Sequence, residues 1–213
     1  DQKARRVEYR NASLEMWGIP VAYTPYFQHP DPTVKRETGF LFPEFGSNSN
    51  VGQFFRAPFF WAIADDKDAT IDPVFTSDEG IVYSGEYRQR FDNGEFNISG
   101  SAAVADREVG NPQVIETRTN QFRGHVFADA RFDLDDQWRT GFDIERSTDQ
   151  TYLRRFDFFG PSDSTLESNA FIEGFNQRNY MAANGYLFQD TRLGSRPDSP
   201  VVFPLLEYKG LGD

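Results

Sequence analysis

The sequence predicts an all-β protein built from antiparallel strands, and three observations point to that class. Polar and apolar residues alternate with a period of two in segment after segment, which is typical of half-buried strands. Aromatic residues make up 16% of the 213 residues, with 22 Phe among them, and aromatic residues favour strands. No segment shows a convincing helical period, so we expect the chain to contain little helix.

The strongest alternation lies in residues 122–134, FRGHVFADARFDL. Even positions there are apolar or small, and odd positions are polar apart from Phe127. Short turn signals such as SDEG at 77–80 and DNGE at 92–95 separate similar segments, whereas 106–119 and 149–168 are predicted to be longer connections. About eight strands in an up-and-down path follow from this pattern: 52–64, 68–77, 80–91, 94–105, 121–134, 137–147, 168–177 and 179–189.

Residues 1–40 have a different character. They contain shorter strand-like pieces interrupted by Gly18, Pro20 and Pro25, followed by a charged stretch with two prolines, HPDPTVKRETG, that predicts a linker. A domain boundary is therefore expected near residue 40. The apolar residues of this part either line a groove for acyl chains or form an ordinary core, and the sequence leaves both interpretations open: Val7, Leu14, Met16, Ile19, Val21 and Tyr23.

Composition argues against several classes of function. A net charge of −11 disfavours nucleic-acid binding, which needs a basic surface. There is no cysteine, and the only histidines, His29 and His125, are far apart, so no metal site of the usual zinc type is predicted. No phosphate-binding loop, nucleophile elbow or calcium loop occurs. We therefore predict no catalytic residues, no cofactor and no enzymatic activity.

The alternation fits two kinds of sheet. A membrane strand needs about 9–11 residues and the predicted strands reach about 10–13, whereas strands of soluble proteins centre near 5–6. The apolar face combines small and aromatic residues, and several aromatics lie near strand ends, as they do at membrane interfaces. These features favour a membrane barrel over a soluble sandwich, which remains the alternative.

Residues 25–75 carry a more specific signal. They read PYFQHPDPTVKRETGFLFPEFGSNSNVGQFFRAPFFWAIADDKDATIDPVF. The order of a PYF segment, K-R-x-x-G-F-L-x-P, P-F-F-W and D-A-T-I-x-P resembles the LptD family of outer-membrane lipopolysaccharide-assembly proteins, also called organic solvent tolerance proteins. VVFPLLEYKG near the end also resembles a family segment that enters the next barrel strand. The chain opens on DQKARRVEYR without a visible signal peptide, so we expect it to be a fragment of a longer protein.

The resemblance implies a fold, a location and a function. Residues 1–40 would be the last strands of a periplasmic β-jellyroll with its linker, and residues 41–213 the first antiparallel strands of a large barrel in the outer membrane. The function would be transport of lipopolysaccharide and its insertion into the outer leaflet. The partners implied are lipopolysaccharide, a lipoprotein plug (LptE-like), periplasmic bridge proteins (LptA-like) and outer-membrane lipids. The alternatives are a small generic outer-membrane barrel and a soluble saccharide-binding sandwich.

Two prolines stand out in the first predicted hairpin. Pro58 and Pro73 lie almost opposite each other if the turn centres on Asp65 and Asp66. Proline has no N–H to donate to a ladder and belongs at edges and bulges. The bland interpretation is a pair of bulges or a strand bend. The resemblance implies instead that these prolines, in the first two strands, loosen the barrel seam where the first strand meets the last, and so form a lateral gate for the lipid.

Two further sets of residues follow from the alternation. One face of the first strand is predicted to line the lipid exit or simply to face lipid: Phe55, Phe59, Trp61 and Ile63. The polar positions of later strands are predicted to face a wet lumen: Arg123, Asp129, Arg131, Asp133, Arg139, Asp143 and Glu145.

Overall fold

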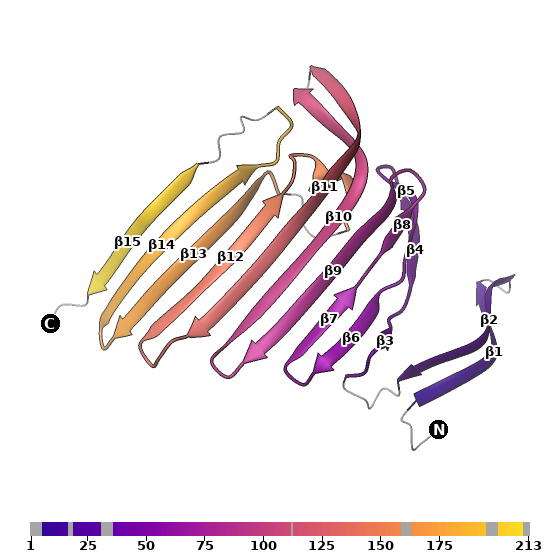
Figure 1. The fold of residues 1–213 in the computed structure, drawn as a ribbon, viewed down its shortest axis with the longest axis horizontal. Coiled ribbons are helices and arrows are strands. Elements are labelled where there is room, and N and C mark those ends of the chain that lie inside the picture. The colour runs from indigo at the N-terminus through magenta and orange to yellow at the C-terminus, as the bar shows by residue number, and fades with distance from the viewer. Residues whose placement is uncertain are drawn as a thin grey trace.

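The chain forms two antiparallel sheets in the computed structural model, which describes residues 6–16, 19–30, 36–111, 113–158, 163–194 and 200–210. A two-stranded sheet contains β1 (Arg6–Met16) and β2 (Ile19–Pro30), and a 13-stranded sheet contains all later strands. The all-β, antiparallel fold class is therefore confirmed. The large sheet does not close on itself: β3 lies at one edge and β15 at the other (Figure 1).

The large sheet follows the chain in an almost unbroken meander. Its path is β15-β14-β13-β12-β11-β10-β9-β7-β6-β3. Off this path, β8 pairs with β9, β5 with β8, and β4 with β5. The strands are β3 (Gly39–Phe40), β4 (Glu44–Asn48), β5 (Gly52–Arg56), β6 (Phe59–Ala64), β7 (Lys67–Ile71), β8 (Val74–Thr76), β9 (Gly80–Phe91), β10 (Gly94–Asn111), β11 (Val114–Asp133), β12 (Trp138–Ser147), β13 (Thr165–Asn176), β14 (Asn179–Asp190) and β15 (Val201–Gly210).

The two ends of the sheet differ in their connections. Tight turns join β6 to β7, β9 to β10, β11 to β12 and β13 to β14 at the lower end of the sheet (Figure 1). The connections from β12 to β13 and from β14 to β15 are longer and lie at the upper end. We call these the short-turn end and the long-loop end. The same asymmetry is found in outer-membrane barrels, whose periplasmic turns are short.

The predicted strand ranges agree with the structure from residue 80 onward, with one exception. Residues 106–119 were expected to connect two strands, but β10 and β11 continue through them and pair as far as Asn111 and Val114. This extension projects beyond the neighbouring strands (Figure 1). Alternation did not reveal it, because neither of its faces is covered and the side chains therefore show no apolar period. Each of the first two predicted strands is also divided in two, β5 from β6 and β7 from β8.

The N-terminal strands pair with each other along most of their length, with an irregularity between Leu14 and Glu15. The side chains of Val7, Leu14, Met16, Ile19 and Val21 lie outside the described residues, as do residues 31–35 of the predicted linker. Tyr23 is described: it is 65% exposed, and its hydroxyl donates to the Asn11 side-chain oxygen at 2.8 Å.

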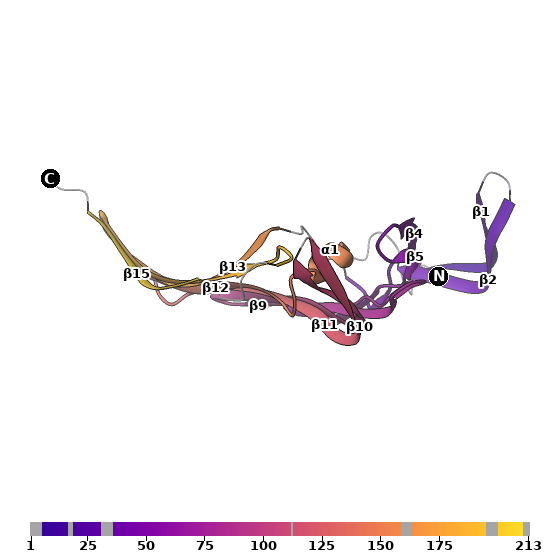
Figure 2. The ribbon, with the colours of Figure 1, turned by 90° about the horizontal axis from the view of Figure 1, so that it is seen from above.

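The large sheet is curved, and the short helix α1 (Tyr152–Arg155) lies over its concave side (Figure 2). This helix belongs to the β12–β13 connection and was not predicted. The main buried cluster forms where this connection meets the sheet, and it contains Val51, Val74, Val82, Ala103, Ala105, Tyr152, Leu153, Phe156 and Leu166. No helix in the described part of the chain is long and apolar enough to cross a membrane.

Candidate functional site

The first hairpin of the sheet is interrupted at one level by its two prolines. Pro58 lies in the gap between β5 and β6, and Pro73 lies in the gap between β7 and β8. Because β5 pairs with β8 and β6 pairs with β7, the two gaps face each other across the hairpin. Among the described residues no ladder rung joins the gaps, so the hairpin is held by backbone pairing only above and below this level.

Backbone groups in the gaps find partners on either side instead of across. The Pro58 carbonyl accepts a hydrogen bond from the Leu41 N–H at 2.8 Å, and the Asp72 N–H donates to the Ser84 carbonyl at 2.9 Å. The Ser84 hydroxyl donates to the Asp72 carbonyl. The interruption therefore leaves these groups satisfied, which a buried or lipid-facing backbone requires.

One ion pair spans the interruption on the concave face. The Arg56 guanidinium, at the end of β5, donates to both oxygens of the Asp72 carboxylate in the opposite gap. It also donates to Glu44 at 3.3 Å. Side-chain exposure is 22% for Arg56 and 13% for Asp72, so the pair is shielded from water and stronger than an open surface pair. The Arg56–Asp72 ion pair thus links the two strands at the level where the ladder hydrogen bonds are missing.

The four residues predicted for the lipid exit do not form one continuous strand face. Phe55 lies on β5 and packs against Phe75 of β8, while Phe59 and Trp61 lie on β6 beyond the gap. Phe55 and Trp61 are 44% and 50% exposed on the convex face. Ile63 sits at a register shift between Ala62 and Ala64. The sequence alternation continues past Pro58, so it did not reveal that the strand is broken between Arg56 and Phe59.

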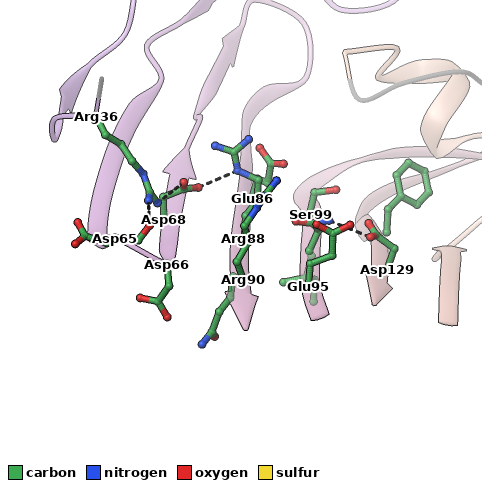
Figure 3. A pocket seen from close by; sticks show the side chains of 14 residues that line it. Arg36, Asp65, Asp66, Asp68, Glu86, Arg88, Arg90, Glu95, Ser99 and Asp129 are labelled. Carbon is green, nitrogen blue, oxygen red and sulfur yellow. Dashed lines mark hydrogen bonds and ion pairs between the residues drawn. The ribbon is translucent and has the colours of Figure 1, made fainter. Parts of the chain in front are cut away.

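Charged side chains line a cavity of about 520 Å³ on the concave face near the short-turn end (Figure 3). Asp68 lies at one side of this cavity. Its carboxylate forms ion pairs with the guanidinium groups of Arg36, at 2.5 Å, and Arg88, at 2.9 Å. Arg36 precedes β3, and it also donates to the Asp65 carbonyl at 2.5 Å. Arg36 is therefore tied to the turn of the first hairpin. The cavity continues to Asp129, which accepts from Asn97 at 2.9 Å.

The seven residues predicted to face a lumen all project from the concave side of β11 and β12, as the register of these strands requires. Two ion pairs join some of them: Arg131 with Asp143 at 2.6 Å and Arg139 with Asp133 at 2.9 Å. These side chains are about half exposed, so each pair contributes little stability. Their arrangement keeps this face polar and hydrated.

Arg123 differs from the other six because it is buried. Its guanidinium donates to both carboxylate oxygens of Asp149, at 2.8 and 3.0 Å, and to the Thr151 hydroxyl at 2.8 Å. Both charged side chains are 1% exposed. The β12–β13 connection therefore folds back over the concave face and covers Arg123. Arg123 lies on the predicted concave face, but the sequence did not reveal that it is covered, because periodicity assigns a face and not what covers it.

A second polar chain lies next to this ion pair. The Ser101 hydroxyl is 2.6 Å from the Tyr152 hydroxyl and 2.7 Å from Nδ1 of His125. Burial raises the pKa of Tyr152 to about 12, so its hydroxyl stays protonated. Burial alone would raise the pKa of Asp149, but the hydrogen bond and charge of Arg123 outweigh it and hold that pKa below its ordinary value. Nothing in the sequence pattern singled out Asp149, Thr151 or Tyr152.

The convex face carries large apolar side chains that remain exposed. Phe122 is 70% exposed, Val104 60% and Leu134 54%. Phe91 and Phe132 pair at the short-turn end with ring centroids 5.4 Å apart. An apolar surface this extensive is unusual on a soluble monomer and typical of a face that meets lipid or another protein. The fold and these surfaces define the class: an open, curved antiparallel sheet with a polar concave face and an apolar convex face.

Comparison with known proteins adds the family. Residues 121–211 match the family model of LptD, described as LPS transport system D. The chain is 31% identical to the LPS-assembly protein LptD of Pasteurella multocida over 192 aligned residues. This alignment covers 86% of the chain and 24% of the relative. It is 33% identical over 171 residues to the LPS-assembly protein LptD of Idiomarina loihiensis, an alignment that covers 78% of the chain and 21% of the relative. It is 30% identical over 208 residues to the LPS-assembly protein LptD of Mannheimia succiniciproducens, an alignment that covers 94% of the chain and 25% of the relative.

The chain thus belongs, through residues 121–211, to the LptD family. It spans no more than a quarter of the length of these relatives.

The buried ion pair yields a prediction for loop order. Asp149→Asn removes the charge opposite Arg123, and an unpaired buried charge costs about 3–5 kcal/mol. We expect trypsin to cut the folded protein faster at Arg154 and Arg155 in this variant, because the connection leaves the sheet. Asp157→Asn, in the same connection but outside the buried pair, is the control. Equal cutting of both variants would contradict the role of the pair.

The lowered pKa of Asp149 predicts an acid-sensitive connection. The ionised carboxylate stabilises the docked state above its ordinary pKa of about 4, and this contribution is lost as the pH falls through the lower, folded-state value. Hydrogen–deuterium exchange of residues 149–158, corrected for intrinsic rates, should rise below about pH 4. The Asp149→Asn protein should exchange fast at every pH, and a wild-type profile that stays flat down to pH 3 would count against the prediction.

Proposed function

We propose that the full-length protein that contains this chain transports lipopolysaccharide and inserts it into the outer leaflet of the outer membrane. The names of the relatives, LPS-assembly protein LptD, support lipopolysaccharide assembly as its role. The observation that carries the proposal is the coincidence of a two-faced sheet with a proline interruption in its first hairpin. One feature suits a barrel wall in lipid, and the other suits a place where that wall opens.

On this proposal residues 41–213 are part of an outer-membrane barrel. The convex face meets lipid, and its exposed aromatic and aliphatic side chains contact the acyl chains instead of water. The concave face lines the lumen, and its mixed charges attract water or a polar partner. The short-turn end is periplasmic and the long-loop end is extracellular, following the usual asymmetry of such barrels. Residues 1–40 belong to a periplasmic β-jellyroll that hands the lipid to the barrel.

The prolines act by weakening the pairing of the first two strands, so that the seam where the first strand meets the last opens more easily. Each ladder bond contributes about 0.5–1.5 kcal/mol, and Pro58 and Pro73 remove donors at the same level. The Arg56–Asp72 pair closes the interruption on the lumen side until the lipid arrives. Acyl chains that leave through the parted strands enter the bilayer without crossing water, and each CH₂ kept out of water is worth about 0.8 kcal/mol. Phe55, Phe59, Trp61 and Ile63 lie beside this exit.

The partners follow from the same arrangement. A lipoprotein plug (LptE-like) contacts the polar concave face, including Asp129, Arg131 and Asp143. Periplasmic bridge proteins (LptA-like) pair with the jellyroll. The protein needs no catalytic group or cofactor for this role, because insertion breaks no covalent bond.

The two alternatives have less support. A soluble saccharide-binding sandwich needs a second sheet packed over the apolar face, and among the described residues the convex side chains remain exposed instead. A small barrel would close on itself, whereas β3 and β15 lie at opposite edges of an open sheet.

Fractionation of the native bacterium tests the membrane placement. We expect the full-length protein in the outer membrane, with a gel mobility that changes on boiling, because closed membrane barrels resist detergent until heated. Detergent-free extraction into the soluble fraction, with no mobility change, would refute the barrel.

A double substitution tests the gate. Pro58→Ala with Pro73→Ala restores two ladder donors and should tighten the hairpin by about 1–3 kcal/mol, which slows strand separation. We expect less lipopolysaccharide at the cell surface and greater sensitivity to large hydrophobic antibiotics at equal protein levels. Pro43→Ala, which lies outside both gaps, is the control. Unchanged surface lipopolysaccharide and unchanged antibiotic resistance in the double variant would refute the lateral gate.

A further inference from the structure

The ladder between β12 and β13 stops before either strand ends. Its last rung joins Asp143 and Asn169, although β12 runs on to Ser147 and β13 begins at Thr165. Above this rung, β12 keeps its pairing with β11, and β13 keeps its pairing with β14. The sheet is therefore split between β12 and β13 toward the long-loop end.

Side chains close the split in place of backbone. The Ser168 hydroxyl accepts from the Glu145 N–H at 3.1 Å and donates to the Glu145 carbonyl at 3.2 Å. The Gln189 side chain, from β14, accepts from the Ser147 N–H at 3.1 Å and donates to the Ser147 carbonyl at 2.7 Å. Backbone groups of β12 are thus satisfied while the strands stand further apart than a ladder allows.

The split opens a groove on the convex face. It encloses about 440 Å³ and is lined almost wholly by apolar atoms. Its lining combines the small residues Ala170 and Gly185 with the large apolar side chains of Phe142, Ile144, Leu187 and Phe203. A Cβ atom on Gly185 would come within 2.9 Å of the Phe203 ring, so the glycine leaves room for that wall.

A lone cation lies above the groove. Arg146 is opposite Val126 on the convex face, two residues beyond Ile144 toward the long-loop end. In the part of the chain that the structure describes, the side chain of Arg146 makes no hydrogen bond or ion pair, whereas its backbone pairs with Val126. An arginine without a partner, next to an apolar groove and near a membrane surface, matches a phosphate above an acyl chain, because guanidinium groups bind phosphate well and extend to the interface.

We propose that this groove binds a phosphate-bearing membrane lipid of net negative charge, with an acyl chain along Ala170 and Gly185 and the phosphate on Arg146. The inference rests on the proposed function, because it requires the convex face to meet lipid. It adds a defined lipid site, separated from the proline interruption by the width of β9, β10 and β11. The site fixes a lipid where β12 and β13 have no ladder rungs and so supports the split strands.

Photocrosslinking in nanodiscs tests the site. The full-length protein is placed in bilayers of phosphatidylcholine with a minority of phosphatidylglycerol. In separate samples, one or the other lipid carries a diazirine on its acyl chain. We expect crosslinks from phosphatidylglycerol to concentrate on residues 142–146 and 201–203. Arg146→Gln should reduce the preference for phosphatidylglycerol over phosphatidylcholine at these residues about fivefold, as expected for one basic residue near a membrane surface. Ala170→Trp, which fills the groove, should remove the concentrated crosslinks.

Two matched variants serve as controls. Val104→Trp adds the same side chain elsewhere on the convex face, and Arg192→Gln removes an arginine that is already paired with Asp190 near the same end. Both should leave the crosslinks unchanged. Crosslinks spread evenly over the convex face, with no effect of Arg146→Gln, would overturn the lipid site and leave the barrel standing. Failure of the protein to enter nanodiscs, with no crosslinks on the convex face, would overturn the barrel and the site together.

Discussion

The structure depends on one constraint: every backbone N–H and C=O of a strand needs a hydrogen-bond partner. Most of the large sheet meets it with regular antiparallel rungs between successive strands. Besides single register shifts, two longer interruptions lie in the described part of the sheet: the proline level of the first hairpin and the upper part of the β12–β13 pair. At both places side chains or neighbouring strands take over: Ser84 and Leu41 at the first, Ser168 and Gln189 at the second.

These two interruptions differ physically. Proline removes donors permanently, so the first hairpin cannot regain its missing rungs by a shift of the strands. The β12–β13 split keeps all its donors, and it persists because Ser168 and Gln189 occupy them. We expect the first to favour separation of strands and the second to favour a fixed gap that something else fills. An apolar groove lies over the second, whereas the Arg56–Asp72 pair crosses the first.

The Arg123–Asp149 pair organises the concave face. A buried ion pair adds little net stability, since desolvation costs about as much as the charges gain, but it strongly disfavours any arrangement that leaves one charge unpaired. It thereby selects one position for the β12–β13 connection, with Tyr152 and Phe156 packed beside the guanidinium. The same connection sits above the split, so its docking and the divergence of β12 and β13 are parts of one local arrangement.

Much of this protein was determined by its sequence alone. The two-residue period of segments such as 122–134 specified the strands and their two faces, because a strand must place alternate side chains on opposite sides. Pro58 and Pro73 marked the interruption in advance, since proline lacks the donor that a ladder needs. Tertiary structure decided the rest: that β10 and β11 extend past Ala105, that Arg123 is covered, and that β12 and β13 part above Asp143. Those features depend on contacts between segments distant in the chain, and a local period carries no information about what lies across a strand or over its face.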